Sequence, residues 1–306
     1  NTLSGDTLSG KYSFLNHKIN KYINNLHKYY EKIELKTNLN RFEIMKIKSN
    51  GFTCLYLKDF IEETTVIIFD NLYRKVKKRY YENKINQKHN HKEYRDYLIW
   101  GTFFRYQYFN IGCQCASYEN VMLESRDKLK IDVELFSSLI NTTLKYFCSL
   151  FHDLEKYFGS VGNFFNFEPV KGFYEIGAPY EETIIIKTLD RIMHFLKNYP
   201  NFSALIFTPV WRIKDRELLN KYCTKKYKIG TPNDFDVAVD TLKNSEYVLV
   251  DRLYCAGDYN YYCYNKMNSQ LSLLPNNVII VSNEFEFVDS SFLPSKFISL
   301  TNEKKY

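Results

Sequence analysis

The sequence lacks the side-chain spacings that proteins use to hold metal ions. Seven cysteines occur at irregular intervals without a Cys-x-x-Cys motif, and the six histidines form no cluster. This pattern predicts neither a zinc site nor a disulfide framework. An odd number of irregularly spaced cysteines fits a reducing compartment best.

Long apolar runs and targeting signals are also missing. No run of about 18 apolar residues occurs, so no transmembrane helix is predicted. The first residues lack the pattern of a secretory signal peptide, and residues 1–10 repeat TLSG and are predicted to be a flexible tail. We therefore expect a cytoplasmic protein, in the cytosol or in a virus factory within it.

Aromatic and basic residues are what the chain has in excess. Aromatic side chains make up 17% of the residues and the formal net charge is +7. Coding bias of an AT-rich genome explains many of the rings, because Asn, Lys and Ile are abundant as well. Stacking on nucleic-acid bases is the alternative for a few of them. The positive charge favours RNA, DNA or acidic lipid surfaces as partners.

Residues 11–128 are predicted to form a mainly helical, basic, RNA-binding domain. Apolar residues recur at helical spacing in 12–36, and 97–112 is an aromatic helix. Residues 71–95 contain nine Lys or Arg and two Glu, with tyrosines between them. Such a stretch can neutralise phosphates and stack on bases, or it can be a solvated helix face. The candidate RNA contacts here are Lys77, Lys78, Arg79 and Arg105.

Residues 129–306 alternate between strand-like and helix-like patterns, which favours an α/β fold with a mainly parallel sheet. The predicted strands are 163–167, 204–207, 247–250 and 277–281, and the predicted helices are 129–151, 183–196 and 212–222. The earlier runs 52–57 and 64–69 are β-like or buried.

The most informative segment is residues 172–182, where a strand is followed by a proline turn and a helix. Open α/β sheets bind ligands at such strand ends. Residues 177–180 read Gly-Ala-Pro-Tyr, and the glycine-punctuated residues 159–162 precede them. Glycines after a strand let backbone amides approach a nucleotide-like ligand, although this spacing is not Gly-x-Gly-x-x-Gly. Asp153 and Glu155 are candidate ribose partners, or surface carboxylates.

Residues 133–182 resemble the cap-specific adenosine N6-methyltransferases, the phosphorylated-CTD-interacting methyltransferases. The Phe-Thr-Pro-Val-Trp-Arg run at 207–212 and the strand at 276–281 resemble that family too, and Trp100 with 105–107 does so more loosely. The resemblance covers roughly residues 95–285. Its central positions are Glu134, Phe136, Ser138, Asn141, Cys148, Ser149, Phe151, Asp153, Tyr157, Phe158, Gly159, Ser160, Gly162, Phe167, Pro169, Gly172, Glu175, Pro179, Glu181 and Glu182.

The resemblance implies a Rossmann-like methyltransferase fold, S-adenosylmethionine as a possible cofactor and the capped 5′ end of mRNA as the partner. It gives the candidate cofactor-binding residues Ser138, Asn141, Phe158, Gly159, Ser160 and Glu175. It adds Tyr180, Trp211 and Arg212 to the candidate RNA contacts.

The chain departs from the family at the residues that matter for catalysis. The family's Asn-Pro-Pro-Phe tetrad is Gly177, Ala178, Pro179 and Tyr180 here. The ring is kept, but Gly177 has no side chain to hold the target amine, and misplacing a reacting group lowers the rate by orders of magnitude. Further departures are Asn166 in place of an acidic residue and Cys255 in place of an arginine.

These departures predict a cap-binding protein on an inactive methyltransferase scaffold. It would recognise the 5′ cap and the first nucleotide, for translation initiation or as a subunit of an RNA-processing complex. The alternative is an active, S-adenosylmethionine-dependent cap adenosine N6-methyltransferase, in which the backbone carbonyls at 177 and 178 hold the amine.

Overall fold

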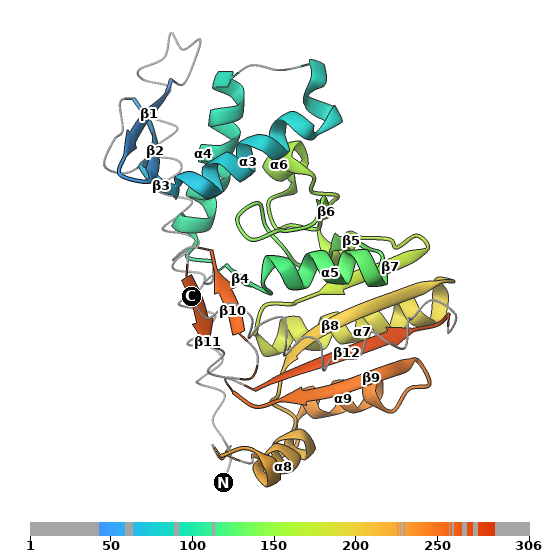
Figure 1. Ribbon diagram of the computed structural model, residues 1–306. Helices are drawn as coiled ribbons and strands as arrows, with labels where there is room; N and C mark the ends of the chain where they lie inside the picture. Colours follow the sequence, from blue (N-terminus) through green and yellow to red (C-terminus); the bar gives the residue numbers. More distant parts are fainter. Residues whose placement is uncertain are drawn as a thin grey trace, which may run out of the picture.

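Within the residues that it describes, the computed structural model shows a mixed α/β protein with three sheets (Figure 1). It describes residues 43–58, 64–88, 92–111, 114–224, 226, 228, 230–256, 258, 260–264, 268–271 and 275–284. The predicted tail at 1–10 and the predicted helix at 12–36 lie outside these ranges.

A six-stranded mixed sheet is the centre of the fold. In sheet order its strands are β6 (Tyr146–Phe147), β5 (Ile131–Glu134), β7 (Gly172–Ile176), β8 (Phe202–Pro209), β12 (Asn276–Ser282) and β9 (Val248–Tyr254). The first four strands run parallel, whereas β12 is antiparallel to both of its neighbours. Every residue of β8 and β12 is buried, which is why the middle of each strand, 204–207 and 278–281, reads as a continuous apolar run in the sequence.

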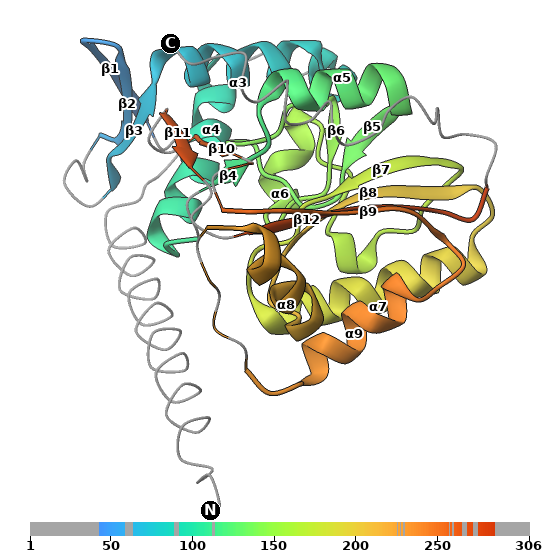
Figure 2. The same cartoon turned by 60° about the horizontal axis from the view of Figure 1, so that its bottom comes forward.

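Helices cover both faces of this sheet (Figure 2). On one face lie α7 (Glu182–Asn198) and α9 (Asp234–Lys243), whose apolar sides pack on the sheet. The side chain of Glu181 caps α7 by accepting a hydrogen bond from the backbone N–H of Ile184 at 2.8 Å. On the other face α5 (Glu119–Leu129) packs on Phe173, Phe207 and their neighbours. The helix therefore belongs to the sheet unit, although it precedes residue 129.

The described part of the chain before α5 combines helices with a small antiparallel sheet. Its antiparallel sheet consists of β1 (Ile44–Ser49), β2 (Phe52–Leu57) and β3 (Val66–Phe69). The helices are α3 (Asp70–Glu82), η1 (Lys84–Lys88) and α4 (Lys92–Tyr108). Their core includes Leu139, Ile140 and Phe158, which come from beyond residue 129. The two parts of the chain therefore share a hydrophobic core.

A small antiparallel sheet also links distant segments. It contains β4 (Cys115–Ala116), β10 (Asn260–Cys263) and β11 (Asn268–Leu271). Because β10 pairs with both other strands, it brings the late tyrosine-rich segment beside the end of the α4 region (Figure 1).

Two predicted elements are wrong. Residues 129–151 are not a helix but β5, a long connection and β6, with the carboxylate of Glu134 accepting hydrogen bonds from the backbone N–H groups of Thr143 and Leu144. Residues 163–167 are not a strand, since Phe164–Asn166 forms the 3-10 helix η3. The short elements α6 (His152–Glu155) and η2 (Lys156–Phe158) lie between them, and α8 (Ile213–Tyr222) confirms the predicted helix at 212–222.

One pair of cysteines is bonded, although the sequence predicted no disulfide framework. Cys223, at the end of α8, forms a disulfide with Cys255, just after β9. Their Cα atoms are 5.9 Å apart, within the ordinary range for a disulfide. Irregular spacing along the chain concealed a pair that the fold brings together.

Arg79 joins α3 to the connection that follows β5. Its guanidinium donates hydrogen bonds to the backbone carbonyls of Thr142, Leu144 and Lys145. Arg79→Ala is expected to lower the free energy of unfolding by about 2–4 kcal/mol, because buried carbonyls lose their donors. The control is Lys78, which forms an exposed ion pair with Glu82. Lys78→Ala should change the free energy of unfolding by less than about 0.5 kcal/mol. Urea unfolding measures both, and equal effects would contradict the structural role of Arg79.

Candidate functional site

A cavity of about 960 Å³ lies where β5 and β7 end. The residues after β5 form one side, the turn at 177–180 forms another, and the segment 114–117 around β4 contributes a third. A cavity of this size accommodates a ligand of nucleotide size or larger. No Lys or Arg of the described chain lines it, so its polar contacts come from neutral side chains and two glutamates.

The four residues of the degenerate tetrad all line this cavity, and Tyr180 has a fixed orientation there. Its hydroxyl lies 2.7 Å from the hydroxyl of Tyr261 and also bonds to the side chain of Asn276. Its ring meets the rings of Trp211 and Tyr261 edge to face, at centroid distances of 6.2 and 6.3 Å. Trp211 therefore supports Tyr180 from outside the cavity lining, and Tyr180 offers a preorganised aromatic surface.

Glu134 and Glu175 face each other as register partners on the parallel strands β5 and β7. Glu134 accepts hydrogen bonds from Ser137, Thr142 and the backbone of residues 143 and 144. No donor to the carboxyl of Glu175 is present among the residues that the structure describes. Burial, followed by the nearby charge of Glu134, raises the pKa of Glu175 well above its usual value. Burial also raises the pKa of Glu134, while the Leu144 N–H and Arg79 oppose that rise.

Glu175→Gln tests this account of the buried carboxyls. A carboxyl whose folded-state pKa is raised stabilises the fold fully below its unfolded pKa, and that stabilisation is lost as the pH rises through the folded pKa. As the pH rises above 4.5, Glu175 should therefore make the free energy of unfolding fall by up to about 1.4 kcal/mol per pH unit, until the carboxyl ionises in the folded protein. In the Glu175→Gln variant, the free energy of unfolding should fall less steeply with pH by this amount. An unchanged slope in urea unfolding at pH 5, 6 and 7 would contradict a protonated Glu175.

Three of the predicted cofactor residues, Ser138, Asn141 and Glu175, lie on the cavity wall. Ser138 and Asn141 fall within the predicted helix 129–151, but they meet in the connection after β5 instead. The side-chain oxygen of Asn141 accepts from the backbone N–H of Ser138 at 2.8 Å and from its hydroxyl at 2.9 Å. The Ser138 hydroxyl is also 2.6 Å from the side-chain oxygen of Gln114. These groups form a polar edge beside the aromatic wall of Phe136 and Phe164.

Three other predicted cofactor residues do not line the cavity. Phe158 is buried in the core shared with α3 and α4. Gly159 has a φ of +109°, and a Cβ there would collide with the carbonyl of Lys145. Ser160 bonds to the hydroxyl of Ser149 at 2.7 Å and to a ring nitrogen of His152 at 3.1 Å. These residues shape the connection after β6.

The candidate ribose partners also lie elsewhere. Asp153 forms an ion pair with Arg105 at 2.7 Å, so the predicted phosphate contact Arg105 has a carboxylate beside it. Glu155 is fully buried and accepts from the N–H of Leu139 at 2.6 Å, and burial raises its pKa to about 7. Asn166 is exposed at the end of η3.

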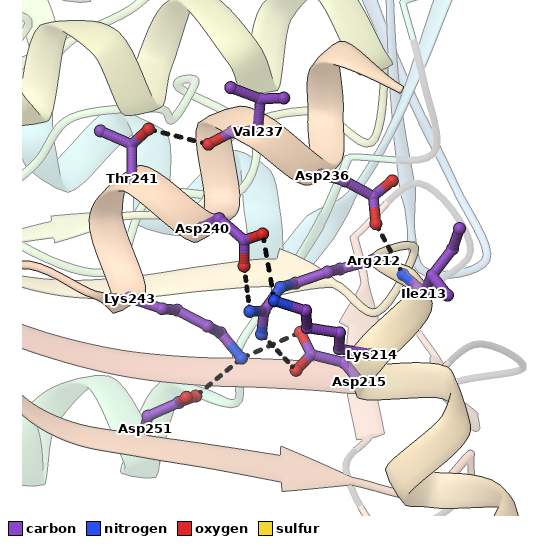
Figure 3. Close-up of polar contacts among 10 residues, drawn as sticks. All are labelled: Arg212, Ile213, Lys214, Asp215, Asp236, Val237, Asp240, Thr241, Lys243 and Asp251. Carbon is purple, nitrogen blue, oxygen red and sulfur yellow. Dashed lines mark hydrogen bonds and ion pairs between the residues drawn. The ribbon is translucent and has the colours of Figure 1, made fainter. Parts of the chain in front are cut away.

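Arg212 belongs to a charged network on the α8 and α9 side of the sheet (Figure 3). Its guanidinium bonds to Asp215 at 3.0 Å and to Asp240. Lys243 continues the network, at 2.9 Å from Asp215 and 3.0 Å from Asp251. Because carboxylates already engage both ends of its guanidinium, the structure favours a structural role for Arg212.

The predicted basic triplet 77–79 separates in space. Arg79 points inward, Lys78 pairs with Glu82, and Lys77 lines a second, smaller cavity of about 280 Å³. We call this second cavity the basic cleft, and its lining residues are Lys46, Lys48, Asp70, Tyr73, Arg74 and Lys77. Lys46 and Lys48 were missed from the sequence, although their spacing of two places both on one face of β1.

Other site residues were missed as well. Gln114 and Tyr261 reach the cavity only because β4 and β10 pair, and no local sequence pattern indicates that pairing. Within the described ranges no helix is long and apolar enough to cross a membrane. No group of three His, Cys, Asp or Glu residues in those ranges could hold a metal ion.

Comparison with known proteins decides the family. Residues 69–247 match the model described as "Phosphorylated CTD interacting factor 1 WW domain". The chain belongs to this family. The human "mRNA (2'-O-methyladenosine-N(6)-)-methyltransferase" is 26% identical over 138 residues, and the mouse protein with the same description is 25% identical over 138 residues. Each alignment covers 42% of this chain and 20% of the relative, so the chain spans about one fifth of the relatives' length.

Proposed function

We propose that this member of the phosphorylated CTD interacting factor 1 family binds the capped 5′ end of mRNA without methylating it. The first adenosine would enter the cavity and stack on Tyr180. The observation that carries this proposal is the placement of the whole turn 177–180 on the wall of a large cavity, with its ring held by Tyr261 and Asn276. The human relative is described as a methyltransferase of an mRNA adenosine, which supports the choice of ligand.

In this proposal the six-stranded unit is a Rossmann-like methyltransferase domain. The part before residue 129 contributes the RNA-binding surface. Bound RNA would pass to a partner in translation or RNA processing, in the cytoplasm or a virus factory.

S-adenosylmethionine, the cofactor implied by the family, fits this cavity incompletely. Phe136 and Phe164 offer apolar contacts, and Ser138 and Asn141 offer hydrogen bonds. The carboxylate of Glu134 is already bound by four donors, and no cation in the described lining can pair with the cofactor's carboxylate. Asp153, Glu155 and Asn166 are not part of this lining. We therefore derive no methyl-transfer step.

The test of the proposed function compares fluorescently labelled RNAs of one sequence that begin with adenosine. The capped RNA should bind more tightly than the uncapped RNA. Equal, weak binding of the two would overturn the proposal. Calorimetry with S-adenosylmethionine, run on the same preparation, should show no binding.

One observation favours the second candidate, an active N6-methyltransferase. No donor to the carbonyls of Gly177 and Ala178 is present among the described residues, so these carbonyls could hold an amine. If this candidate is right, the protein should transfer a radiolabelled methyl group from S-adenosylmethionine to capped RNA. Absence of transfer at high protein concentration, together with no cofactor binding, would reject it.

The basic cleft is where we expect RNA phosphates to bind. The double variant Lys48→Gln/Lys77→Gln should reduce the slope of log affinity against log salt concentration by about 1–2, because each phosphate contact releases counterions. The control is Lys78→Gln, which leaves the cleft intact and should preserve the slope. An unchanged slope in the double variant would make the cleft an ordinary solvated surface.

A further inference from the structure

We propose that the neutral carboxyl of Glu175 replaces the missing side chain at position 177 and pairs with the Watson–Crick edge of the bound adenine. Its carbonyl oxygen accepts from the N6 amine, and its hydroxyl donates to N1. The inference rests on the proposed function, because it specifies how the first adenosine is held in the same cavity.

The position of the carboxyl supports this assignment. A Cβ built on Gly177 would lie 2.8 Å from the Oε1 atom of Glu175. The carboxyl therefore lies against the position that a side chain at residue 177 would take. Strand alternation places residues 175 and 177 on the same side of the chain, and the glycine leaves room for the carboxyl.

Glu175 is also a buried polar residue on the cavity wall. It is 7% exposed and lines the cavity next to the tetrad. No side chain or backbone N–H among the described residues donates to its carboxyl. The carboxyl is therefore available to form hydrogen bonds with a ligand in the cavity.

The surroundings keep this carboxyl protonated. Glu134 faces it from β5, and its register partner on β8 is the apolar Leu205. The other titratable groups on the cavity wall are the thiols of Cys115 and Cys148 and the hydroxyls of Tyr106, Tyr180 and Tyr261. Two adjacent buried carboxyls do not both ionise. Because four donors stabilise the ionised form of Glu134, Glu134 carries the charge and Glu175 stays neutral.

A protonated carboxyl presents one donor and one acceptor side by side. The Watson–Crick edge of adenine presents the complementary pair, the N6 amine and N1. An ionised carboxylate could accept from the amine but could not donate to N1. A glutamine has the same donor and acceptor pair as the neutral acid, which makes Glu175→Gln the matched variant and Glu175→Ala the disruptive one.

The experiment measures binding of capped RNAs that begin with adenosine or with 1-deazaadenosine, which lacks only N1. Wild type should prefer adenosine by about five- to tenfold, the value of one hydrogen bond. Glu175→Gln should keep this preference, and Glu175→Ala should abolish it. Equal binding of the two RNAs by wild type, or an undiminished preference in Glu175→Ala, would overturn the inference.

Failure of the inference can be distinguished from failure of the proposed function. Its failure would appear as equal affinity of wild type for capped and uncapped RNA. The comparison of the two first nucleotides in wild type needs no variant, so the inference stays testable even where Glu175→Ala does not fold.

Discussion

Replacing Tyr180 with alanine is expected to weaken the binding of capped RNA about 5- to 150-fold, the loss of about 1–3 kcal/mol of base stacking. The ring forms part of the cavity wall, and its edge-to-face contacts with Trp211 and Tyr261 hold it in one orientation. A base that stacks on this ring therefore meets a surface that is already ordered. Fluorescence titration of a capped, adenosine-initiated RNA measures the effect.

Tyr180→Phe is the control for this prediction. It keeps the stacking surface and removes the hydroxyl that bonds to Tyr261 and Asn276. Its binding should stay close to that of wild type. If Tyr180 serves only the core, Tyr180→Ala would lose stability in urea unfolding while its folded fraction bound RNA normally, and the stacking role would be wrong.

Replacing Gly159 with alanine is expected to destabilise the fold by about 2–4 kcal/mol. Gly159 has a φ of +109°, which disfavours side chains, and the carbonyl of Lys145 fills the space that a Cβ would take. Of its two neighbours, Phe158 is buried in the hydrophobic core and Ser160 forms a hydrogen bond with Ser149. Urea unfolding measures the loss.

Gly162→Ala is the matched comparison for Gly159→Ala. Gly162 has a φ of +136° but no atom within 4 Å of an added Cβ, so this variant carries backbone strain without a collision. It should therefore lose less stability than Gly159→Ala. Equal losses would show that the close approach of Lys145 does not matter.

The elements that the sequence predicted best are long and strongly patterned. The buried side of α7 follows helical spacing, and β8 and β12 read as apolar runs because both faces of each strand are covered. The turn at 177–180 was found because it stands between such elements. Its place on a cavity wall follows from the parallel strands that end beside it.

The parts that were predicted wrongly depend on contacts between distant residues. Val133, Leu139 and Ile140 have helical spacing, yet they enter different cores, and the side chain of Glu134 organises the connection between them. The basic run 77–79 looks uniform in the sequence, but its side chains point to a cleft, to solvent and to the interior. Periodicity along one segment carries no information about such partners.

The central claim is that the cavity beside Tyr180 holds the first adenosine of capped mRNA. A crystal soaked with both a cap dinucleotide and S-adenosylhomocysteine tests it most directly. The account predicts density for the adenine against the Tyr180 ring, with its Watson–Crick edge toward Glu175 and no S-adenosylhomocysteine in the cavity. S-adenosylhomocysteine in the cavity, with the dinucleotide elsewhere or absent, would contradict it.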